Sequence, residues 1–299
     1  MFFKTLYTAA AAGLMLLGTA CYSLLELEPL EPSDITVQEL IARMNHATDP
    51  KQAYRGCKSY LIKQNLYVMQ SGTKDVMTSE VRFQAPDKMR ITTFRSGKPT
   101  TVEIYNAGKG WRIDCGTGKV AKVPEGLPIE LMRIFTQMGT PSLDATRIFK
   151  KVTIDMKVED GFKTYRLICD PCIDGIAPYV QYISGKTYLA ERLETVMYAN
   201  GAEYLYVSVP ADYTWYGDIR LPASSTVELM NITRISKMAE FRINVDFPDS
   251  DFLPPEPAFS NNGKAKTTGK TAVKKEPAKE TAVNTTEQKP VQTGKDKAK

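Results

Sequence analysis

A side-chain pattern of period two runs through most of the chain and limits the fold more than any other feature. Val81 and Phe83 alternate with polar neighbours, and the series from Phe241 to Phe247 does the same. Successive side chains of a strand point to opposite faces, so the pattern predicts strands with one buried face. The expected strands fall near residues 59–70, 80–84, 88–95, 102–105, 110–115, 119–123, 151–158, 162–169, 178–184, 187–199, 203–210, 219–230 and 241–247.

Turn residues separate these strands. Asn200-Gly201 between two strand patterns is a strong hairpin signal, and Asp160-Gly161 and Ser184-Gly185-Lys186 are further turns. Strands joined in succession by short turns form an antiparallel meander, and this many strands curl into a barrel or part of one. The sequence therefore predicts a fold that is mainly β with added helices (α+β), built on a curved antiparallel sheet.

Helical spacing interrupts the strand pattern at two places. The capping box Thr36-Val37-Gln38-Glu39 begins a predicted helix over 36–47. Pro128 suits the first turn of a second helix, and residues 141–149 form a shorter helical stretch. The helical residues from Pro128 to 149 form an insert between two halves of the sheet. This insert is expected to cover the concave face, either as a lid over a cavity or as part of a filled core. Its apolar residues at helical spacing are Leu131, Met132, Phe135 and Met138.

Apolar side chains on the later strands suggest a partner surface for the insert. Together with the apolar residues of the insert, they could line an apolar groove. Methionine suits a loosely shaped lipid because its side chain is flexible and polarizable. The alternative is an ordinary hydrophobic core without space for a ligand. The candidate lining residues of these strands are Leu189, Leu193, Leu221 and Val227.

The N-terminus has the layout of a secretory signal, so the protein is expected to be exported to the cell envelope. One lysine precedes an apolar run that is too short to span a bilayer, and small residues and Cys21 follow. Leu17-Gly18-Thr19-Ala20-Cys21 resembles the lipobox of bacterial lipoproteins, which predicts a signal peptide over 1–20 and a lipid on Cys21. Tyr22, in place of a retaining aspartate, favours the outer membrane, facing the periplasm. The alternative is ordinary cleavage after Ala20.

Two segments flank the expected folded domain of residues 36–257. Residues 21–35 are rich in Glu and Pro and are predicted to form a tether from the lipid anchor. Residues 258–299 contain ten lysines and few apolar side chains, which predicts a disordered tail. The tail could contact peptidoglycan or anionic lipid. In the tail, lysines exceed acidic residues by more than the net charge of +5 of the full chain. The folded domain is therefore nearly neutral, and no nucleic-acid partner is expected.

The cysteines other than Cys21 are even in number, which suggests two disulfides in an oxidising compartment. Cys169 and Cys172 have the spacing of thiol oxidoreductases, but the pair follows a strand pattern and enters a Pro/Gly loop. Structural pairing is therefore favoured over redox chemistry, with the connectivity left open. The four candidates are Cys57, Cys115, Cys169 and Cys172.

No pattern in the sequence indicates catalysis. His46 is the only histidine and lies on the predicted first helix, without a nucleophile motif nearby. Glu191 and Glu194 would lie on opposite faces of one strand and could not act together as an acid/base pair. The expectation is a protein without catalytic residues, metal ligands or a cofactor.

Several motifs resemble those of LolA-like proteins, the outer-membrane lipoprotein-sorting and carrier family. The resemblance rests on the order and spacing of five segments across about residues 36–255. These are Ala85-Pro86-Asp87-Lys88-Met89-Arg90-Ile91, Ile104-Tyr105-Asn106-Ala107-Gly108-Lys109-Gly110-Trp111, Ile183-Ser184-Gly185-Lys186-Thr187-Tyr188-Leu189-Ala190-Glu191-Arg192-Leu193-Glu194, Tyr216-Gly217-Asp218-Ile219-Arg220-Leu221-Pro222 and Asp246-Phe247-Pro248-Asp249-Ser250-Asp251-Phe252.

The resemblance implies an unclosed barrel whose helices cover an apolar concavity that holds acyl chains. The expected function is non-catalytic binding of the acyl chains of lipoproteins or another lipid, in outer-membrane lipoprotein sorting. The alternative is an envelope interaction or sensor module with the same fold and a filled core.

Overall fold

One antiparallel sheet contains every strand of the described residues. The computed structural model describes Leu25, Leu27 and residues 30–138, 145–199 and 202–255. Its strand order is β1-β8-β9-β10-β11-β12-β13-β14-β2-β3-β4-β5-β6-β7, and the edge strands β1 and β7 do not pair, so the sheet is open. The predicted fold class is confirmed. The strands are β1 Glu31–Pro32, β2 Ser59–Gln70, β3 Thr73–Gln84, β4 Lys88–Arg95, β5 Lys98–Asn106, β6 Lys109–Asp114, β7 Lys119–Lys122, β8 Lys151–Glu159, β9 Phe162–Asp170, β10 Tyr179–Ser184, β11 Ala190–Ala199, β12 Ala202–Tyr216, β13 Ile219–Leu229 and β14 Ile232–Ile243.

Two-residue connections explain why consecutive strands pair in antiparallel fashion. Five of them have both residues at positive φ, the conformation of the type I′ hairpin turn, whose twist matches that of the strands it joins. Glycine occupies the second place in four of these turns because it adopts positive φ without strain. The five turns are Ser71–Gly72, Ser96–Gly97, Ala107–Gly108, Asp160–Gly161 and Met230–Asn231.

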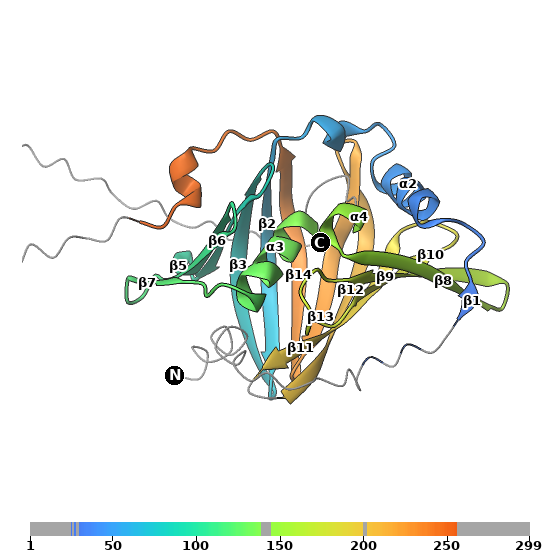
Figure 1. Cartoon of the computed structure of the whole chain (residues 1–299). Helices are drawn as coiled ribbons and strands as arrows, with labels where there is room; N and C mark the ends of the chain where they lie inside the picture. Colours follow the sequence, from blue (N-terminus) through green and yellow to red (C-terminus); the bar gives the residue numbers. More distant parts are fainter. Residues whose placement is uncertain (1–24, 26, 28–29, 139–144, 200–201, 256–299) are drawn as a thin grey trace, which may run out of the picture. The chain divides into compact units, whose positions relative to one another are not determined.

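The α-helices of the described residues are α2 (Val37–Thr48), α3 (Leu127–Met138) and α4 (Ala145–Ile148). Thr36 caps α2 as predicted, since its hydroxyl accepts a 3.1 Å hydrogen bond from the backbone N–H of Glu39. Figure 1 shows α3 and α4 against the curved sheet, with α2 to one side, above β8, β9 and β10. The predicted second helix is confirmed, and part of the predicted stretch 141–149 lies outside the described residues, as does the turn at 200–201.

The largest hydrophobic cluster lies between the helices and the concave face of β8–β10. Leu40 of α2 and Ile134 of α3 are fully buried there, with Tyr165, Leu167 and Tyr179 of the sheet. Burying such side chains contributes about 1.5–3 kcal/mol each to stability. This half of the concave face is therefore a filled core.

The last predicted strand lies in a different place from its expected range. The sequence indicates a strand over 241–247, but β14 covers Ile232–Ile243. Asn244 ends it at a positive φ of 53°, and its side-chain Oδ1 accepts a 3.0 Å hydrogen bond from Lys58 N. Arg234 and Ser236 occupy inward positions of β14, so its first half does not show an apolar alternation.

The predicted tether is partly folded. Glu31 and Pro32 pair with Met156 and Asp155 of β8 as an edge strand. Leu25 is buried against Ala177, Val180 and Val196, a smaller cluster on the convex face of the sheet. The described residues of this segment, Leu25, Leu27 and 30–35, therefore pack along the domain. Cys21 and the segments 1–20 and 256–299 lie outside the described residues.

Candidate functional site

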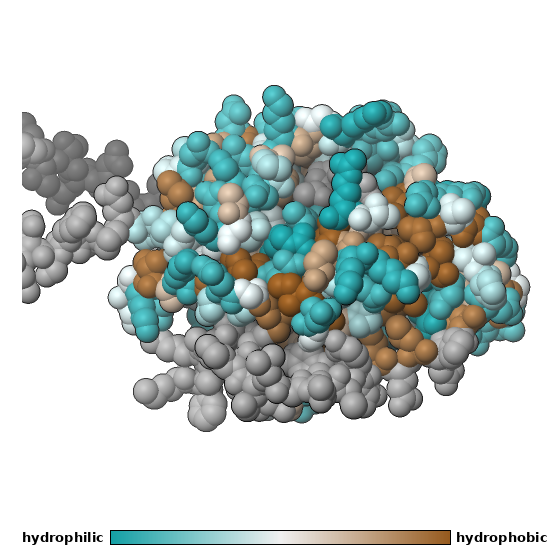
Figure 2. Space-filling model, in the orientation of Figure 1, coloured by the Kyte–Doolittle hydropathy of each residue, from teal (hydrophilic) through white to brown (hydrophobic). Residues whose placement is uncertain are grey.

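A pocket of about 320 Å³ lies between α3 and the concave face. Leu131, Met132 and Phe135 of α3 cover it, and Phe135 is 38% exposed although it is a large apolar side chain. Figure 2 shows hydrophobic side chains at the surface over the centre of this face. We call it the lid pocket. Its other lining residues are Val68, Met77, Met89, Ile91, Glu103, Arg112, Pro128, Met197, Tyr206, Val227, Leu229, Ile232 and Arg234.

A glycine lets α3 lie close to the sheet. A Cβ added at Gly110 in β6 would lie 2.8 Å from Ile129 Cδ1 and 2.8 Å from Met132 Sδ, closer than these atoms can pack. The lid side chains therefore occupy the space that any other residue at this position would fill.

Two arginines interrupt the apolar lining of the lid pocket. Arg112 on β6 forms a 3.0 Å ion pair with Glu103 on β5, so its charge is balanced. Arg234 on β14 is half-buried and makes no hydrogen bond or ion pair with another described residue. An unpaired guanidinium beside apolar surface attracts carboxylate or phosphate groups, which it can bind bidentately. The lid pocket thus combines apolar walls with one available cation.

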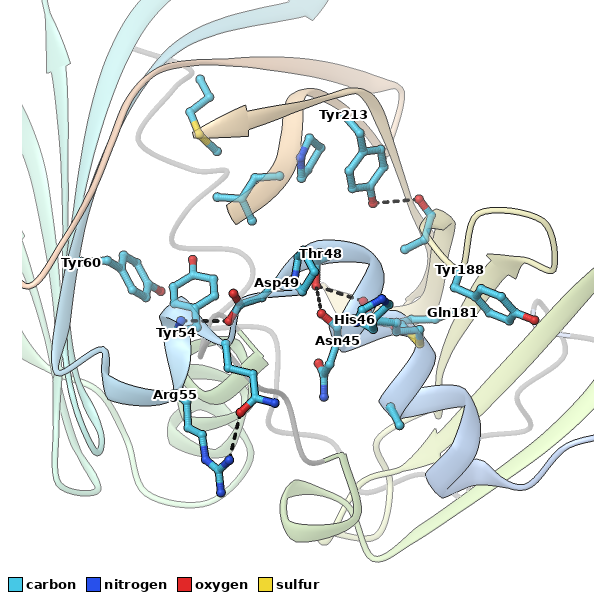
Figure 3. A pocket seen from close by; sticks show the side chains of 18 of the residues that line it. Asn45, His46, Thr48, Asp49, Tyr54, Arg55, Tyr60, Gln181, Tyr188 and Tyr213 are labelled. Atoms are coloured by element: carbon cyan, nitrogen blue, oxygen red, sulfur yellow. Dashed lines mark hydrogen bonds between the residues drawn. The ribbon is translucent and has the colours of Figure 1, made fainter. Parts of the chain in front are cut away.

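A second, larger pocket of about 860 Å³ lies at the other end of the same strands. Four tyrosines and residues of α2 surround it, and Figure 3 shows Tyr54 and Tyr60 on one side of the last turn of α2, with Gln181 and Tyr188 on the other. We call it the tyrosine pocket. It is lined by Ala42, Met44, Asn45, His46, Thr48, Asp49, Pro50, Gln52, Tyr54, Arg55, Tyr60, Ile62, Gln181, Tyr188, Ala190, Tyr213, Leu221, Pro222 and Met238.

Polar side chains separate the two pockets on the concave face. Gln64 lies between Ile62 of the tyrosine pocket and Val68 of the lid pocket on β2, and its Nε2 donates to Ser79 Oγ at 2.9 Å. The hydroxyls of Ser208 and Ser225 lie 3.2 Å apart on β12 and β13. We call these four residues, with Ser236 of β14, the polar row. The concavity is therefore divided into two compartments.

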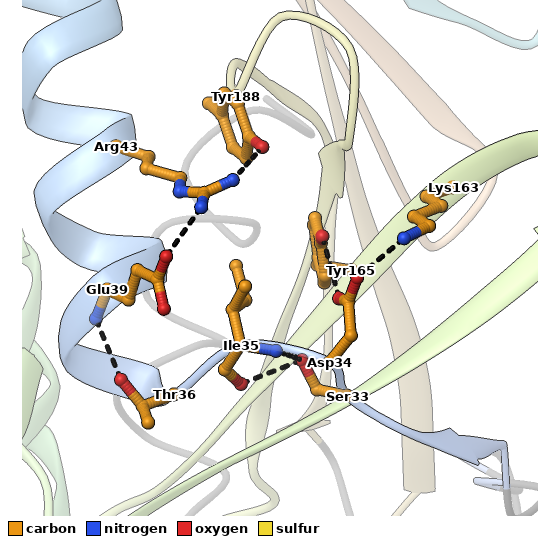
Figure 4. A network of polar contacts seen from close by, with 9 residues as sticks. All are labelled: Ser33, Asp34, Ile35, Thr36, Glu39, Arg43, Lys163, Tyr165 and Tyr188. Atoms are coloured by element: carbon orange, nitrogen blue, oxygen red, sulfur yellow. Dashed lines mark hydrogen bonds and ion pairs between the residues drawn. The ribbon is translucent and has the colours of Figure 1, made fainter.

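A network of polar contacts holds α2 beside the tyrosine pocket (Figure 4). Arg43 donates to the hydroxyl of Tyr188 and pairs with Glu39 at 2.5 Å. Tyr188 stacks on Tyr165, whose hydroxyl donates to Asp34 at 2.9 Å. Hydrogen bonds from Lys163 and Tyr165 hold the pKa of Asp34 below its usual value, so the carboxylate accepts both bonds at neutral pH.

The predicted lining residues are divided among three places. Leu131, Met132, Phe135 and Val227 meet in the lid pocket. Leu221 lines the tyrosine pocket instead, because it lies six residues before Val227 on the same face of β13. Leu193 packs against the large core and Leu189 is buried, and neither lines one of these pockets. Met138 ends α3, and its side chain lies outside what the structure describes.

The four described cysteines are free thiols, so the structure contains neither of the two predicted disulfides. Cys169 and Cys172 are close in sequence but point to different surroundings. The Cys169 side chain is buried in the large core, whereas Cys172 is exposed and its thiol contacts Ile148 O at 3.4 Å. Cys57 precedes β2 and Cys115 follows β6, with three strands between them in the sheet.

Alkylation of the native protein is expected to modify Cys172 first and Cys169 last. Burial raises the pKa of the Cys169 thiol to about 12, and the thiolate is the reactive form. Peptide mapping by mass spectrometry after brief iodoacetamide treatment at pH 8 would measure the order. The urea-unfolded chain is the control, in which the two should react alike. Protection of Cys172 that only a reductant removes would contradict the free thiols.

The described part of the chain offers no metal site and no membrane-spanning helix. No group of three His, Cys, Asp or Glu side chains within it converges as metal ligands would. None of its helices is both long and apolar enough to cross a bilayer. His46 is exposed on α2 at the tyrosine pocket.

Solved structures share this fold, although no protein-family model matches the chain and no curated protein does. A LolA superfamily protein from Nitrosomonas europaea is 9% identical with a TM-score of 0.52, over 73% of this chain and 98% of that one. A DUF1329 family protein from Desulfovibrio piger is 12% identical with a TM-score of 0.53, over 72% and 95%. A domain described as an outer-membrane lipoprotein-sorting protein, from Vibrio parahaemolyticus, is 11% identical with a TM-score of 0.50, over 71% and 94%. The chain has a LolA-like fold.

Proposed function

We propose that this chain is a non-catalytic, lipid-binding protein of the bacterial cell envelope that holds acyl chains in the lid pocket. One observation carries the proposal: an apolar pocket lies between a helix and the concave face of an open sheet, beside the half-buried Arg234, which has no ionic partner among the described residues. Acyl chains would lie against the apolar walls, and Arg234 would bind the acidic or polar end of the ligand.

The composition of the lid pocket suits flexible chains. Met77, Met89, Met132 and Met197 contribute to its walls. Methionine adapts to irregular shapes because it has no branch and three rotatable bonds. Each methylene that leaves water contributes about 0.8 kcal/mol, so partial burial of one chain can support reversible binding.

The fold and the lipobox-like segment of the sequence support a proposal for the cargo and the location. We infer that the acyl chains are those of lipoproteins or another envelope lipid, and that the protein takes part in outer-membrane lipoprotein sorting. The description of the similar Vibrio parahaemolyticus domain agrees with this role. The lipobox-like segment ending in Cys21 supports export and attachment of the protein to the outer membrane, where its own lipid would be the anchor.

Extraction of bound lipid tests the proposal directly. The full chain carrying Cys21→Ser has no covalent lipid, so any lipid in an organic extract was bound to the folded protein. Mass spectrometry should find about one equivalent of fatty acid or phospholipid. A clean extract from a folded sample, together with no binding of added fatty acid, would instead favour an interaction or sensor module with a filled core.

Replacement of Arg234 should reduce the affinity for acids without affecting neutral lipids. Arg234→Met keeps the length and apolar character of the side chain but removes the cation. Charged hydrogen bonds contribute about 1.5–3 kcal/mol, so palmitate should bind about tenfold or more weakly. Hexadecanol binding should be unchanged. Titration calorimetry of both ligands measures the difference, and equal losses for acid and alcohol would show that Arg234 does not contact the head group.

A further inference from the structure

The charged side chains of the tyrosine pocket are bonded within the chain or exposed to solvent. The two carboxylate oxygens of Asp49 accept hydrogen bonds from the backbone N–H groups of Ala53 and Tyr54, at 2.7 and 2.8 Å. The Arg55 guanidinium donates to Gln52 Oε1 at 2.9 Å. The exposed His46 lies on α2, so its imidazole also meets solvent. Because Arg55 and His46 are exposed to water and Asp49 is already bonded, a charged ligand group deeper in the pocket would meet no buried ion of opposite charge that is free to bind it, which favours an uncharged ligand.

Four tyrosine rings line the pocket, and the hydroxyls of Tyr188 and Tyr213 are hydrogen-bonded to Arg43 and to Ala190 O. Tyr54 and Tyr60 make no hydrogen bond through their hydroxyls to another described residue. Burial raises the pKa of both above the ordinary value, so the hydroxyls stay protonated and can donate. A tyrosine ring packs against apolar surface while its hydroxyl bonds a polar group. The ligand that fits has apolar faces and hydroxyl groups together.

Gln181 adds an acceptor without a partner. It lies on the concave face of β10, and its side-chain Oε1 is buried without a hydrogen bond in the described structure. Buried polar atoms of native proteins nearly always have partners, so an orphan beside a large pocket needs an explanation. A hydroxyl donated by a ligand would supply one after a small rotation of the amide.

The pocket lies where the sheet opens between neighbouring strands. Six strands line it: β2, β10, β11, β12, β13 and β14. Beyond Ser208, β12 pairs with β13 but not with β11, and from Met238 onward β14 pairs with β2 but not with β13. A peptide that adds to such an edge binds mainly through its backbone, which leaves the tyrosine hydroxyls and Gln181 unused, so a neutral peptide is the rival ligand in the experiment.

We propose that the tyrosine pocket is a second binding site, which takes an uncharged glycosyl group. A sugar ring combines apolar C–H faces with hydroxyls on its rim, which matches tyrosine rings beside free hydroxyls and the orphan Gln181. Its volume of about 860 Å³ lies within the range of small-molecule sites and could hold more than one ring. The sugar could be free or be the head group of a glycolipid, whose chains would cross the polar row into the lid pocket.

The methionines allow each site to be observed separately. Met44 and Met238 line the tyrosine pocket, whereas four other methionines line the lid pocket. The full chain with Cys21→Ser and ¹³C-labelled methionine methyl groups would be titrated with octyl glucoside below its micelle concentration. Octanol is the matched control, and free maltose forms a second arm. We expect the glucoside to shift Met44 and Met238 and to bind at least tenfold more tightly than octanol.

Each result of the titration has a defined meaning. Shifts at Met44 and Met238 with maltose alone support a free saccharide, and shifts only with octyl glucoside support a glycolipid head group. The proposal is overturned if sugars do not shift the methyl signals of Met44 and Met238. This holds even if alkyl chains shift the signals of the lid-pocket methionines, a result that would support acyl-chain binding in the lid pocket alone. Shifts with a neutral tripeptide amide but not with sugars also overturn it.

Two conservative variants test the assigned contacts. Tyr54→Phe and Tyr60→Phe remove only a hydroxyl, and each should weaken glucoside binding about fivefold while octanol binding stays constant. Tyr67→Phe is the control, because Tyr67 lies on β2 with the opposite parity and contacts Lys74 and Lys237. An equal effect of Tyr67→Phe would place the sugar elsewhere.

Discussion

Phe135→Asp is expected to abolish the co-purification of lipid with the folded protein. Phe135 lies on the lid pocket but is 38% exposed, so the carboxylate can reach water in the empty protein and the fold should survive. A bound acyl chain would desolvate that carboxylate, and burying an unpaired charge costs several kcal/mol. A loss of that size is at least a hundredfold in affinity. Extraction and mass spectrometry of the variant should find no lipid.

The control separates a lid effect from a general effect of adding charge. Val158 is a similarly exposed apolar residue, 43% accessible, near the end of β8 and away from the lid pocket. Val158→Asp should retain lipid at the level of the unmodified chain. Leu131→Asp should repeat the loss seen with Phe135→Asp. Lipid retained by both lid variants would show that α3 does not cover the ligand.

The sequence predicts the sheet well because its signals are local. Alternating side chains define strands, and glycine in tight turns defines which strands pair. The lid was also predictable, since Pro128 and the apolar residues at helical spacing after it mark an amphipathic helix that must cover the sheet somewhere. These features need only a few neighbouring residues to be recognised.

The tyrosine pocket could not be predicted, because its residues come from separate parts of the chain. Tyr54 belongs to the 3₁₀ turn Ala53–Gly56, Tyr188 to a loop and Tyr213 to β12. β-Bulges add a further difficulty. The register of β14 against β2 shifts between Met238 and Glu240, so Met238 and Phe241 lie opposite Gln64 and Ile62, which share a face, although their own spacing is odd. A strict count of alternation assigns one of them to the wrong side.

Polar residues on the concave face make the extent of the concavity difficult to predict from the sequence. Several polar residues occupy inward positions, although a hydropathy pattern assigns polar side chains to the solvent-facing side of a strand. They are Gln64, Ser79, Arg234 and Ser236. The cysteines mislead in the opposite direction, since an even count suggests disulfides, whereas the four described cysteines are free thiols. Pairing in space depends on the strand order, which brings β14 beside β2 from the far end of the chain.

Arg166→Ala is expected to cost about 3–5 kcal/mol in the free energy of unfolding, the largest effect on stability that we predict. Arg166 lies directly opposite Asp155 across β8 and β9, with Nε–Oδ1 and Nη2–Oδ2 distances of 2.9 and 2.6 Å. The two side chains are only 6% and 19% exposed. Removal of the cation leaves the largely buried Asp155 carboxylate without its partner, which destabilises the fold more than removal of both charges would. Urea unfolding followed by circular dichroism gives the free energy.

Two comparisons show whether burial is the cause. Arg242→Ala breaks a 2.5 Å pair with Glu240 whose side chains are 55% and 34% exposed, so it should cost less than about 1 kcal/mol. The double variant Arg166→Met with Asp155→Leu removes both charges and should recover most of the lost stability, because no ion then remains without a partner. If the double variant is as unstable as Arg166→Ala, shape and packing at this position matter more than the buried charge.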